Sequence, residues 1–263
     1  MKSLSIMVSG GLDSYIAYRI ATADNKKIAQ YEDIIPIFVN LGQPYAQKEL
    51  QTCKKLFGEE LIIVDSELYK HQAHEATLLN PEIFGRNTLC AFFGAVYSDI
   101  TWLCALETEM TRFTVRDKQP EFFHLCSSLF TFVFKAQREE TIVLTPFHDI
   151  SKTEMIKLAL VNEFVTHAEL METVSCYHSE KMLCGKCLTC FKRWIAMTNN
   201  GIHEPYEAHP YYDNAYAIDT VKAMRFELQE GKLSGKYTKK RIIETMDALS
   251  LIGIHTDIFF RDN

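Results

Sequence analysis

Through the first two-thirds of the chain, short apolar runs alternate with longer segments whose apolar residues recur at helical spacing. The short runs predict five buried strands, at residues 4–8, 34–39, 60–64, 100–106 and 141–145. The longer segments predict helices at residues 13–21, 45–56, 86–97, 121–134 and 152–160. Strands separated by helices of this length favour an α/β fold with a doubly wound parallel sheet.

The alternation of strands and helices breaks at Asn199-Asn200-Gly201, and the remainder of the chain has a different character. Two helical segments, 215–228 and 239–251, are joined by a link that contains Gly, Lys and Ser. The chain is therefore expected to divide into three parts: an α/β domain over residues 1–170, a cysteine-rich segment over 171–200 and a helical C-terminal appendage over 201–263.

Composition narrows the class of protein. The 263 residues are 47% hydrophobic and 24% charged, which is ordinary for a globular protein with a sizeable core. The net charge of −6 argues against bulk binding of nucleic acid. No apolar stretch is long enough to span a membrane and no secretory signal is visible, so the sequence predicts a cytoplasmic protein.

The first predicted strand leads directly into a loop with the sequence Ser9-Gly10-Gly11-Leu12-Asp13-Ser14. Glycines let a backbone approach an anion, and the following helix offers free N–H groups and the positive end of its dipole. The loop is therefore predicted to bind phosphate, although an ordinary strand–turn–helix corner also contains Gly-Gly. It is not a Walker A loop, since no G-x-x-x-x-G-K pattern closes on Ser or Thr, and it lacks the third glycine of a dinucleotide fingerprint.

The S-G-G-x-D-S pattern resembles the pyrophosphate-binding loop (PP-loop) of the N-type ATP pyrophosphatases, which split ATP between its α and β phosphates. The resemblance implies that Asp13 organises the loop or Mg²⁺. It also implies that ATP and pyrophosphate are held by the remaining residues of the loop, namely Ser9, Gly10, Gly11, Leu12 and Ser14.

Four cysteines fall within fifteen residues, in the spacing C-x7-C-x2-C-x2-C formed by Cys176, Cys184, Cys187 and Cys190. Four thiolates suit the tetrahedral geometry of a structural zinc ion, and they leave no open position for a catalytic water. An iron–sulfur cluster is the competing interpretation. The remaining cysteines, Cys53, Cys90, Cys104 and Cys126, are interpreted as core residues of a reduced protein.

Together, the loop and the cysteine pattern resemble the 7-cyano-7-deazaguanine synthase (QueC) family of the queuosine pathway. The run Thr173-Val174-Ser175-Cys176-Tyr177, then Cys184-Gly185-Lys186-Cys187 with Cys190, stands almost as in the family, and Arg193 follows. Further matches lie in register at Gly42-Gln43 with Glu49-Leu50, Gly85-Arg86-Asn87-Thr88, Asp117 with Glu121-Phe122, and Pro146 with Ser151-Lys152-Thr153-Glu154. The resemblance covers about residues 1–198.

The resemblance implies an ATP-dependent ligase that adenylates 7-carboxy-7-deazaguanine, releases pyrophosphate and transfers the acyl group to an amine. A second ATP would convert the amide to the nitrile. Asp13, Arg86 and Lys152 are the implied catalytic residues, with Asn87 on the nucleotide. Gln43, Asp117 and Glu121 are the implied substrate contacts. ATP, Mg²⁺ and structural Zn²⁺ are the implied cofactors, and a homodimer is the implied assembly.

Two segments depart from the family pattern: Leu41-Gly42-Gln43-Pro44-Tyr45 and Thr111-Arg112-Phe113-Thr114. These changes leave the amine acceptor open between ammonia and an amine of a partner protein, as QueC-like proteins are known in antiviral defence systems. A related adenylating enzyme that acts on tRNA is a second alternative, in which Cys90 is the candidate thiol for thiolation. A binding module that kept the fold without catalysis is a third.

Overall fold

The computed structural model describes residues 2–28, 30–71, 83–106, 116–178, 180–231 and 233–254. The departing segment Thr111–Thr114 lies outside these described residues. The loop at Ser9, the four cysteines of the cluster and the two C-terminal helices lie within the described residues.

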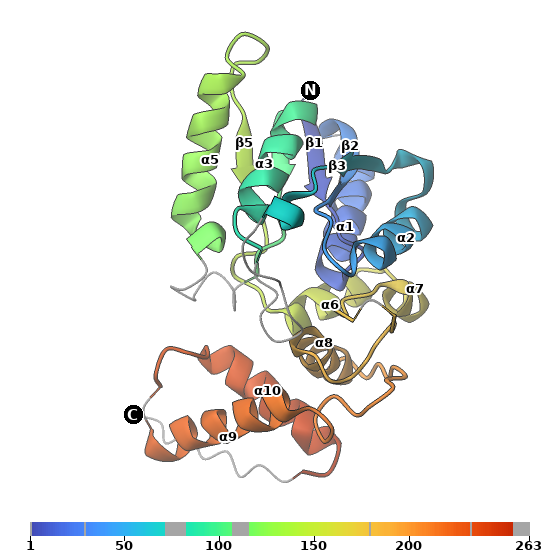
Figure 1. Cartoon of the computed structure of the whole chain (residues 1–263), viewed down its shortest axis with the longest axis vertical. Coiled ribbons are helices and arrows are strands. Elements are labelled where there is room, and N and C mark those ends of the chain that lie inside the picture. Colours follow the sequence, from blue (N-terminus) through green and yellow to red (C-terminus); the bar gives the residue numbers. More distant parts are fainter. Residues whose placement is uncertain are drawn as a thin grey trace.

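In the described part of the chain, five strands form one parallel sheet with the order β3-β2-β1-β4-β5. The strands are β1 (Lys2–Met7), β2 (Tyr31–Asn40), β3 (Ile62–Asp65), β4 (Ile100–Trp102) and β5 (Ile142–Leu144), and all but β4 are labelled in Figure 1. The order reverses between β1 and β4, where doubly wound sheets bind ligands beyond the carboxyl ends of their strands. The predicted fold class is confirmed.

Helices cover both faces of the sheet, because alternate strand residues point to opposite faces. Leu4, Ile6 and Phe38 pack in one core with α1 (Leu12–Ile28), α2 (Ala46–Phe57) and α6 (Lys152–Val161). Met7, Ile37 and Val39 pack in a second core with α3 (Arg86–Tyr97) and α5 (Pro120–Val133). Short 3-10 turns lie at Gly58–Glu60, Leu68–His71 and Arg116–Lys118.

The strand predicted at residues 100–106 is shorter in the structure, because β4 ends at Trp102. Its neighbour β5 ends at Leu144, and the next residue, Thr145, forms hydrogen bonds through its side chain. The Thr145 hydroxyl donates to the Ala105 carbonyl at 2.9 Å and accepts from the Ala105 N–H at 3.3 Å. The apolar run thus continues past the sheet as a loop.

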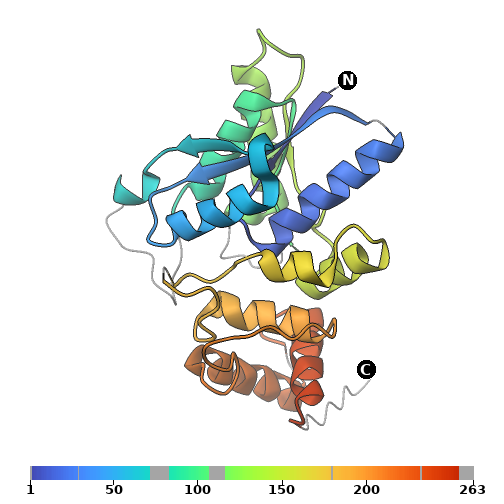
Figure 2. The ribbon, with the colours of Figure 1, turned by 90° about the vertical axis from the view of Figure 1, so that its right-hand side faces the viewer.

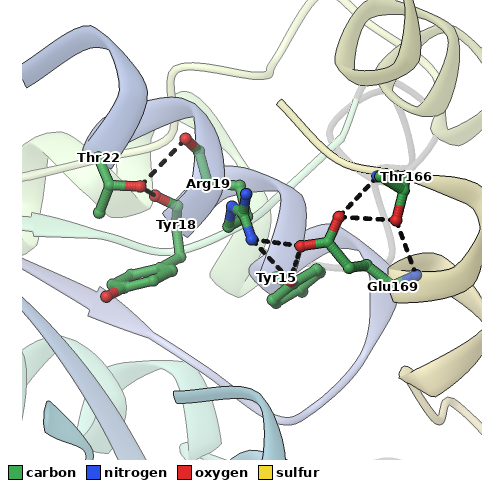
Figure 3. A network of polar contacts seen from close by, with 6 residues as sticks. All are labelled: Tyr15, Tyr18, Arg19, Thr22, Thr166 and Glu169. Carbon is green, nitrogen blue, oxygen red and sulfur yellow. Dashed lines mark hydrogen bonds and ion pairs between the residues drawn. The ribbon is translucent and has the colours of Figure 1, made fainter. Parts of the chain in front are cut away.

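Two helices were not among the predicted ones: α7 (His167–Glu172) and α8 (Leu188–Thr198). Thr166 and Glu169 form a capping box at the start of α7. Figure 3 shows how this cap also holds α1: the Glu169 carboxylate accepts hydrogen bonds from the Tyr15 hydroxyl, at 3.0 Å, and from the Arg19 guanidinium. The helix after the Ser9–Ser14 loop is therefore tied to the chain that leads into the cysteine cluster.

The last part of the chain contains α9 (Ala215–Glu230) and α10 (Lys239–Leu251). Both pack on α8 around a core that includes Phe191, Trp194 and Met246. In Figure 2, α8 lies between these two helices and the sheet. The predicted helical appendage is confirmed, while the division of the chain at residues 170 and 200 stays a prediction.

Among the described residues, no helix combines the length and the apolar character that crossing a lipid bilayer requires.

Candidate active site and metal centre

A cavity of about 260 Å³ opens at the carboxyl ends of β1, β2 and β4. It brings together most of the site residues predicted from the sequence: Ser9, Gly11, Leu12, Asp13, Ser14, Gln43, Arg86, Asn87 and Lys152. Gly10, Asp117 and Glu121 do not line it. The structure therefore gathers residues from separate chain segments into one concave site.

Gly10 does not contact the cavity, but its backbone conformation allows the turn of the loop. Its φ of +70° is one that side-chain-bearing residues rarely adopt, and a Cβ there would lie 2.9 Å from the Thr52 side chain. Its carbonyl accepts a hydrogen bond of 2.9 Å from the Val174 N–H. Only glycine fits this position, which joins the loop to both α2 and the chain before Cys176.

The loop turns directly into a helix that points its N-terminus at the cavity. The Ser14 hydroxyl accepts from the Ser9 N–H and donates to the Gly11 carbonyl, both at 3.3 Å. Because α1 begins at Leu12, its first N–H groups have no partner within the helix. These N–H groups and the helix dipole make the loop suited to an anion such as phosphate.

Lys152 and Asp13 form an ion pair in the lining of the cavity. The Lys152 ammonium lies 2.5 Å from both carboxylate oxygens of Asp13, and both side chains are about one-quarter exposed. Lys152 is the first residue of α6, directly after the N-cap residue Ser151. A cation is therefore held at the end of the Ser9–Ser14 loop by a helix start that is itself fixed by a capping box.

Arg86 and Asn87 also line the cavity and come from the first turn of α3, which packs on the other face of the sheet from α6. The Arg86 Nε donates to the Asn87 Oδ1 at 3.4 Å, and the Asn87 amide donates to the Asp117 carbonyl oxygen at 3.2 Å. Asp117 thus reaches the site through its backbone. Glu121 lies exposed in the first turn of α5, away from the cavity lining.

Glu49 is a cavity residue that the predicted site does not include. Its carboxylate accepts a hydrogen bond of 2.6 Å from the Gln43 amide. Burial raises the pKa of Glu49 to about 7, although the charges of Arg86 and Lys48 oppose this. The sequence signal was the Glu49-Leu50 match to the family, since no spacing rule singles out this glutamate.

Aromatic and cationic side chains complete the lining. The rings of Tyr45 and Tyr177 lie 5.0 Å apart, and burial raises the pKa of the Tyr45 hydroxyl above its ordinary value. Lys118 and Lys192 also line the cavity, and neither was among the predicted residues. They come from a 3-10 turn and from α8, so only the tertiary structure brings them to the loop at Ser9.

The four cysteines of the predicted metal site meet as one buried cluster, with all four Sγ atoms within 4.8 Å of one another. Cys184 and Cys190 are 3.9 Å apart at sulfur, and Cys176 and Cys187 are 4.0 Å apart. Around a tetrahedral zinc ion with zinc–sulfur distances of about 2.3 Å, the sulfur atoms lie just under 4 Å from one another. The cluster therefore fits a tetrahedral metal ion.

Backbone groups support the sulfur atoms. Cys176 Sγ accepts from the N–H groups of His178 and Cys184, and Cys187 Sγ accepts from the Cys190 N–H at 3.4 Å. Hydrogen bonding to Cys176 and Cys190 holds the pKa of Cys187 below its ordinary value. Gly185 is required at the turn, because its φ is +73° and a Cβ would collide with the Ala208 carbonyl.

Lys48 connects this cluster to the cavity. Its ammonium is buried and donates to three carbonyl oxygens of the cysteine loop: those of Cys176 at 2.7 Å, Lys181 at 2.9 Å and His178. Lys48 precedes the cavity residue Glu49 on α2. The loop between Cys176 and Cys184 is therefore fastened to the helix that lines the cavity.

Arg193, which matched the family pattern, has a buried position in α8. Its guanidinium binds the Glu204 carboxylate, with Nε at 2.8 and 3.1 Å from the two oxygens, and both side chains are 1% exposed. It also donates to the Thr173 hydroxyl at 2.8 Å and the Leu170 carbonyl at 2.9 Å. Arg193 thus joins three segments of the fold and does not line the cavity.

The single cysteines divide into two pairs. Cys53 and Cys126 are buried core residues, as expected. Cys90 and Cys104 are half-buried and line the cavity, which a core interpretation does not describe. Burial raises the pKa of the Cys90 thiol to about 11, which disfavours the thiolate that sulfur transfer requires.

Comparison with known proteins shows to which family the chain is similar. The family model described as queuosine biosynthesis protein QueC matches residues 3–201. A 7-cyano-7-deazaguanine synthase from Prochlorococcus marinus is 25% identical over 223 residues, which cover 75% of this chain and 97% of the relative. One from Chlorobium phaeobacteroides is 23% identical over 234 residues and covers 79% and 98% of the two chains.

A solved structure shows a weaker likeness. It is the U34-tRNA thiolase NcsA from Methanococcus maripaludis with its 4Fe-4S cluster, at 16% identity and a TM-score of 0.38. The likeness covers 62% of this chain and 56% of that one, and is too distant to carry an argument about either metal or substrate.

The curated relatives bear the name of an enzyme, and the family model spans the α/β domain, the loop at Ser9 and all four cysteines. The resemblance predicted from the sequence is confirmed: the chain belongs to the QueC family of queuosine biosynthesis proteins.

Proposed function

We propose that this protein is an ATP-dependent ligase that adenylates the carboxylate of 7-carboxy-7-deazaguanine. The observation that carries the proposal is the single cavity in which the Ser9–Ser14 loop, Lys152 and Arg86 meet. A phosphate-binding loop with two cations suits attack of a carboxylate on the α-phosphate of ATP. The name of the curated relatives supports the choice of substrate.

In the first step, a substrate carboxylate oxygen attacks the α-phosphorus of ATP and the bond to the β-phosphate oxygen breaks. Pyrophosphate leaves with the electron pair, and an acyl adenylate forms. We assign pyrophosphate binding to Ser9, Gly11 and Ser14 and to the N–H groups at the start of α1. Lys152 and Arg86 would stabilise the negative charge that develops on the transferred phosphoryl group.

In the second step, an amine attacks the acyl carbonyl, AMP leaves, and the amine nitrogen loses a proton to give the amide. A second ATP would adenylate the amide oxygen and release pyrophosphate. AMP would then leave with that oxygen while the nitrogen loses both of its protons, which gives the nitrile. Cys90 and Cys104 take no part in this scheme. The raised pKa of Cys90 is why we do not favour the thiolation alternative.

Mg²⁺ bound to ATP would neutralise phosphate charge and align the oxygens. The residue in the described site that fits it is Asp13, whose carboxylate lies at the end of the loop and is partly exposed. Asp13 would hold the ion, and the Lys152 ammonium beside it would bind phosphate oxygens. The ion at Asp13 and the ammonium of Lys152 would thus both offset the negative charge of the phosphates.

We place the deazaguanine at the end of the cavity formed by Gln43, Glu49 and Tyr45 with Tyr177. Carboxylate and amide oxygens there would accept hydrogen bonds from the N–H groups of the base, and the tyrosine rings offer apolar surface to its face. Asp117 would act through the carbonyl oxygen that fixes Asn87. A direct substrate role for Glu121 has no support in its exposed position.

For the cysteine cluster we propose a structural Zn²⁺. Four buried thiol ligands and the absence of an open position favour zinc, which would rigidify the loop held by Lys48. None of the eight cysteines, all of which the structure describes, forms a disulfide, which supports a reducing, cytoplasmic compartment.

We further propose a homodimer. The outer face of α5 exposes Leu125, Leu129, Phe132 and Val133, and Phe132 is 82% exposed. An apolar helix face of this kind favours a protein partner over solvent.

The test is mass analysis of the product formed by purified protein from ATP, 7-carboxy-7-deazaguanine and ammonia, together with AMP and pyrophosphate release. We expect the amide, the nitrile or both. A carboxylate-dependent exchange of pyrophosphate without any ammonia adduct would keep the adenylation and point to another amine, such as that of a partner protein. No nucleotide turnover with this substrate would reject the proposal.

A further inference from the structure

The C-terminal helix α10 contacts the segment that carries Lys152. The Ser151 hydroxyl donates to the Glu244 carboxylate, and the Lys240 ammonium binds the Glu154 carboxylate at 2.8 Å. Lys240 also donates to the Asp149 carbonyl at 3.1 Å. Two residues one turn apart on α10 therefore hold the residues on both sides of Lys152.

Ser151 is the residue through which these contacts reach Lys152. It is fully buried, and its hydroxyl accepts from the Glu154 N–H at 3.1 Å as the N-cap of α6. Because a hydroxyl has one proton, donation to Glu244 leaves its lone pairs free for that N–H. The Glu154 carboxylate returns to the Ser151 N–H at 2.7 Å, which closes the capping box.

Glu244 is itself held in place. The Asn199 side-chain amide, at the C-cap of α8, donates to the Glu244 carbonyl at 2.8 Å. On α10, Met246 and Leu249 are completely buried in the core shared with Phe191 of α8. The contact between Glu244 and Ser151 is therefore supported by the packed core between α10 and α8.

The family match ends at residue 201, whereas Lys240 and Glu244 lie well beyond it. The contacts to Ser151 and Glu154 thus come from a part of the chain that the family model does not include. They end on the first turn of α6, whose first residue pairs with Asp13 of the loop.

We propose that Glu244, with Lys240, is a positioning residue that fixes the Lys152 ammonium for the phosphates of ATP. The proposal rests on the proposed function, because that function places Lys152 on the phosphates. The C-terminal appendage then contributes to the site, because it holds the start of α6, the helix that carries Lys152.

The test compares Glu244→Ala with Asp247→Ala, an exposed carboxylate on the same helix. The first readout is labelling of Lys152 by an amine-reactive reagent, followed by peptide mass spectrometry with the exposed Lys157 of α6 as internal reference. The second is substrate-dependent exchange of pyrophosphate into ATP, with kcat and the KM for ATP measured separately. Glu244→Gln is the conservative variant, because its amide oxygen can still accept from Ser151.

We expect Glu244→Ala to raise labelling of Lys152 several-fold relative to Lys157, because the ammonium leaves Asp13 more often. Misplacing a reacting group by about 1 Å costs up to roughly 100-fold in rate, so kcat should fall about 10- to 100-fold while the KM for ATP changes less. Glu244→Gln should restore most of both values, and Asp247→Ala should leave both unchanged.

Folded Glu244→Ala with wild-type labelling and kcat would overturn the proposal, as would an equal effect of Asp247→Ala. If Glu244→Ala does not fold, Lys240→Met takes its place, and unchanged labelling in that variant would also overturn it. Absence of exchange in the wild-type protein counts against the proposed function alone, because the labelling of Lys152 is measured without substrate.

Discussion

The Lys152 ammonium lies 2.5 Å from both carboxylate oxygens of Asp13, which joins the first turn of α6 to the loop after β1. These residues are 139 positions apart in the chain. If Lys152 stabilises phosphate charge, its loss should remove a transition-state interaction worth about 100- to 1,000-fold in rate. Lys152→Met should therefore lower the kcat of pyrophosphate exchange by this amount.

The matched control is Lys157→Met, which removes an exposed lysine from the same helix and should leave the rate unchanged. Both variants should melt within a few degrees of the wild type. A Lys152→Met protein with full exchange activity would show that this cation is not used.

The carboxylate of Glu49 should make stability depend on pH. Its pKa in the folded protein is about 7, raised from an ordinary 4.5 by burial. At a pH below the ordinary pKa of 4.5, Glu49 is protonated in both the folded and the unfolded state, and its contribution to the free energy of unfolding is fully present. As pH rises through about 7 that contribution is lost, because the folded protein must bury a charge that the unfolded chain exposes to water.

Glu49→Gln should remove this part of the pH dependence, measured as the unfolding midpoint in urea across the range from acidic to slightly alkaline pH. Glu59→Gln, at an exposed glutamate just after α2, is the control and should leave the slope unchanged. Equal slopes for the wild type and Glu49→Gln would contradict the raised pKa.

Loss of one cysteine ligand should release the metal ion. Cys187 is completely buried, so Cys187→Ser should reduce bound zinc from about one per chain to none and lower the melting temperature by many degrees. Cys126→Ser, at a buried cysteine outside the cluster, should keep the metal. Elemental analysis of purified protein decides this, and iron with sulfide in place of zinc would favour the iron–sulfur interpretation.

Lys48→Met should weaken the connection between the cysteine loop and the cavity. Three carbonyl oxygens would lose a charged donor, and the buried one, that of Cys176, would cost about 1–3 kcal/mol if left unsatisfied. We expect faster removal of the metal by a chelator and weaker ATP binding by calorimetry. Lys54→Met, at an exposed lysine of the same helix, should behave as the wild type. If the two variants released metal at the same rate, the contact would have no such role.

Arg193→Met should destabilise the protein by about 3–5 kcal/mol, because it leaves the buried Glu204 carboxylate without a cation, although the Tyr206 hydroxyl still donates to it at 2.9 Å. The double variant Arg193→Met/Glu204→Leu should recover part of this loss, since it removes the unpaired charge as well. Urea unfolding measures both. If Arg193→Met were as stable as the double variant, the buried Glu204 carboxylate would not be the cause of the loss.

Much of the chemistry can be predicted from short stretches of the sequence. The Ser9–Ser14 sequence predicts an anion site because glycines and a helix start are local features, and four cysteines within fifteen residues predict a metal site for the same reason. The alternation of apolar runs and helices also predicts the parallel sheet, since periodicity reports which face of each element is buried. Local sequence therefore determined the fold class and the two candidate ligand-binding elements.

Other features depend on contacts between residues far apart in the chain. The strand predicted at residues 100–106 ends at Trp102 because its partner β5 ends, which an apolar run cannot reveal. Glu49 gains its raised pKa from burial in the cavity, and Lys48 finds three carbonyls of a loop about 130 residues away. Neither environment is encoded in the neighbouring residues.

The PP-loop shows where the two kinds of information meet. The sequence by itself determined that residues 9–14 can hold phosphate, that Lys152 and Arg86 are candidate cations and that four cysteines can hold a metal. Only the tertiary structure decided that Lys152 pairs with Asp13 and that Glu244 of α10 braces the helix start beneath it. The physical reason is that a binding loop is made by consecutive residues, whereas the position of a charge is set by whatever packs around it.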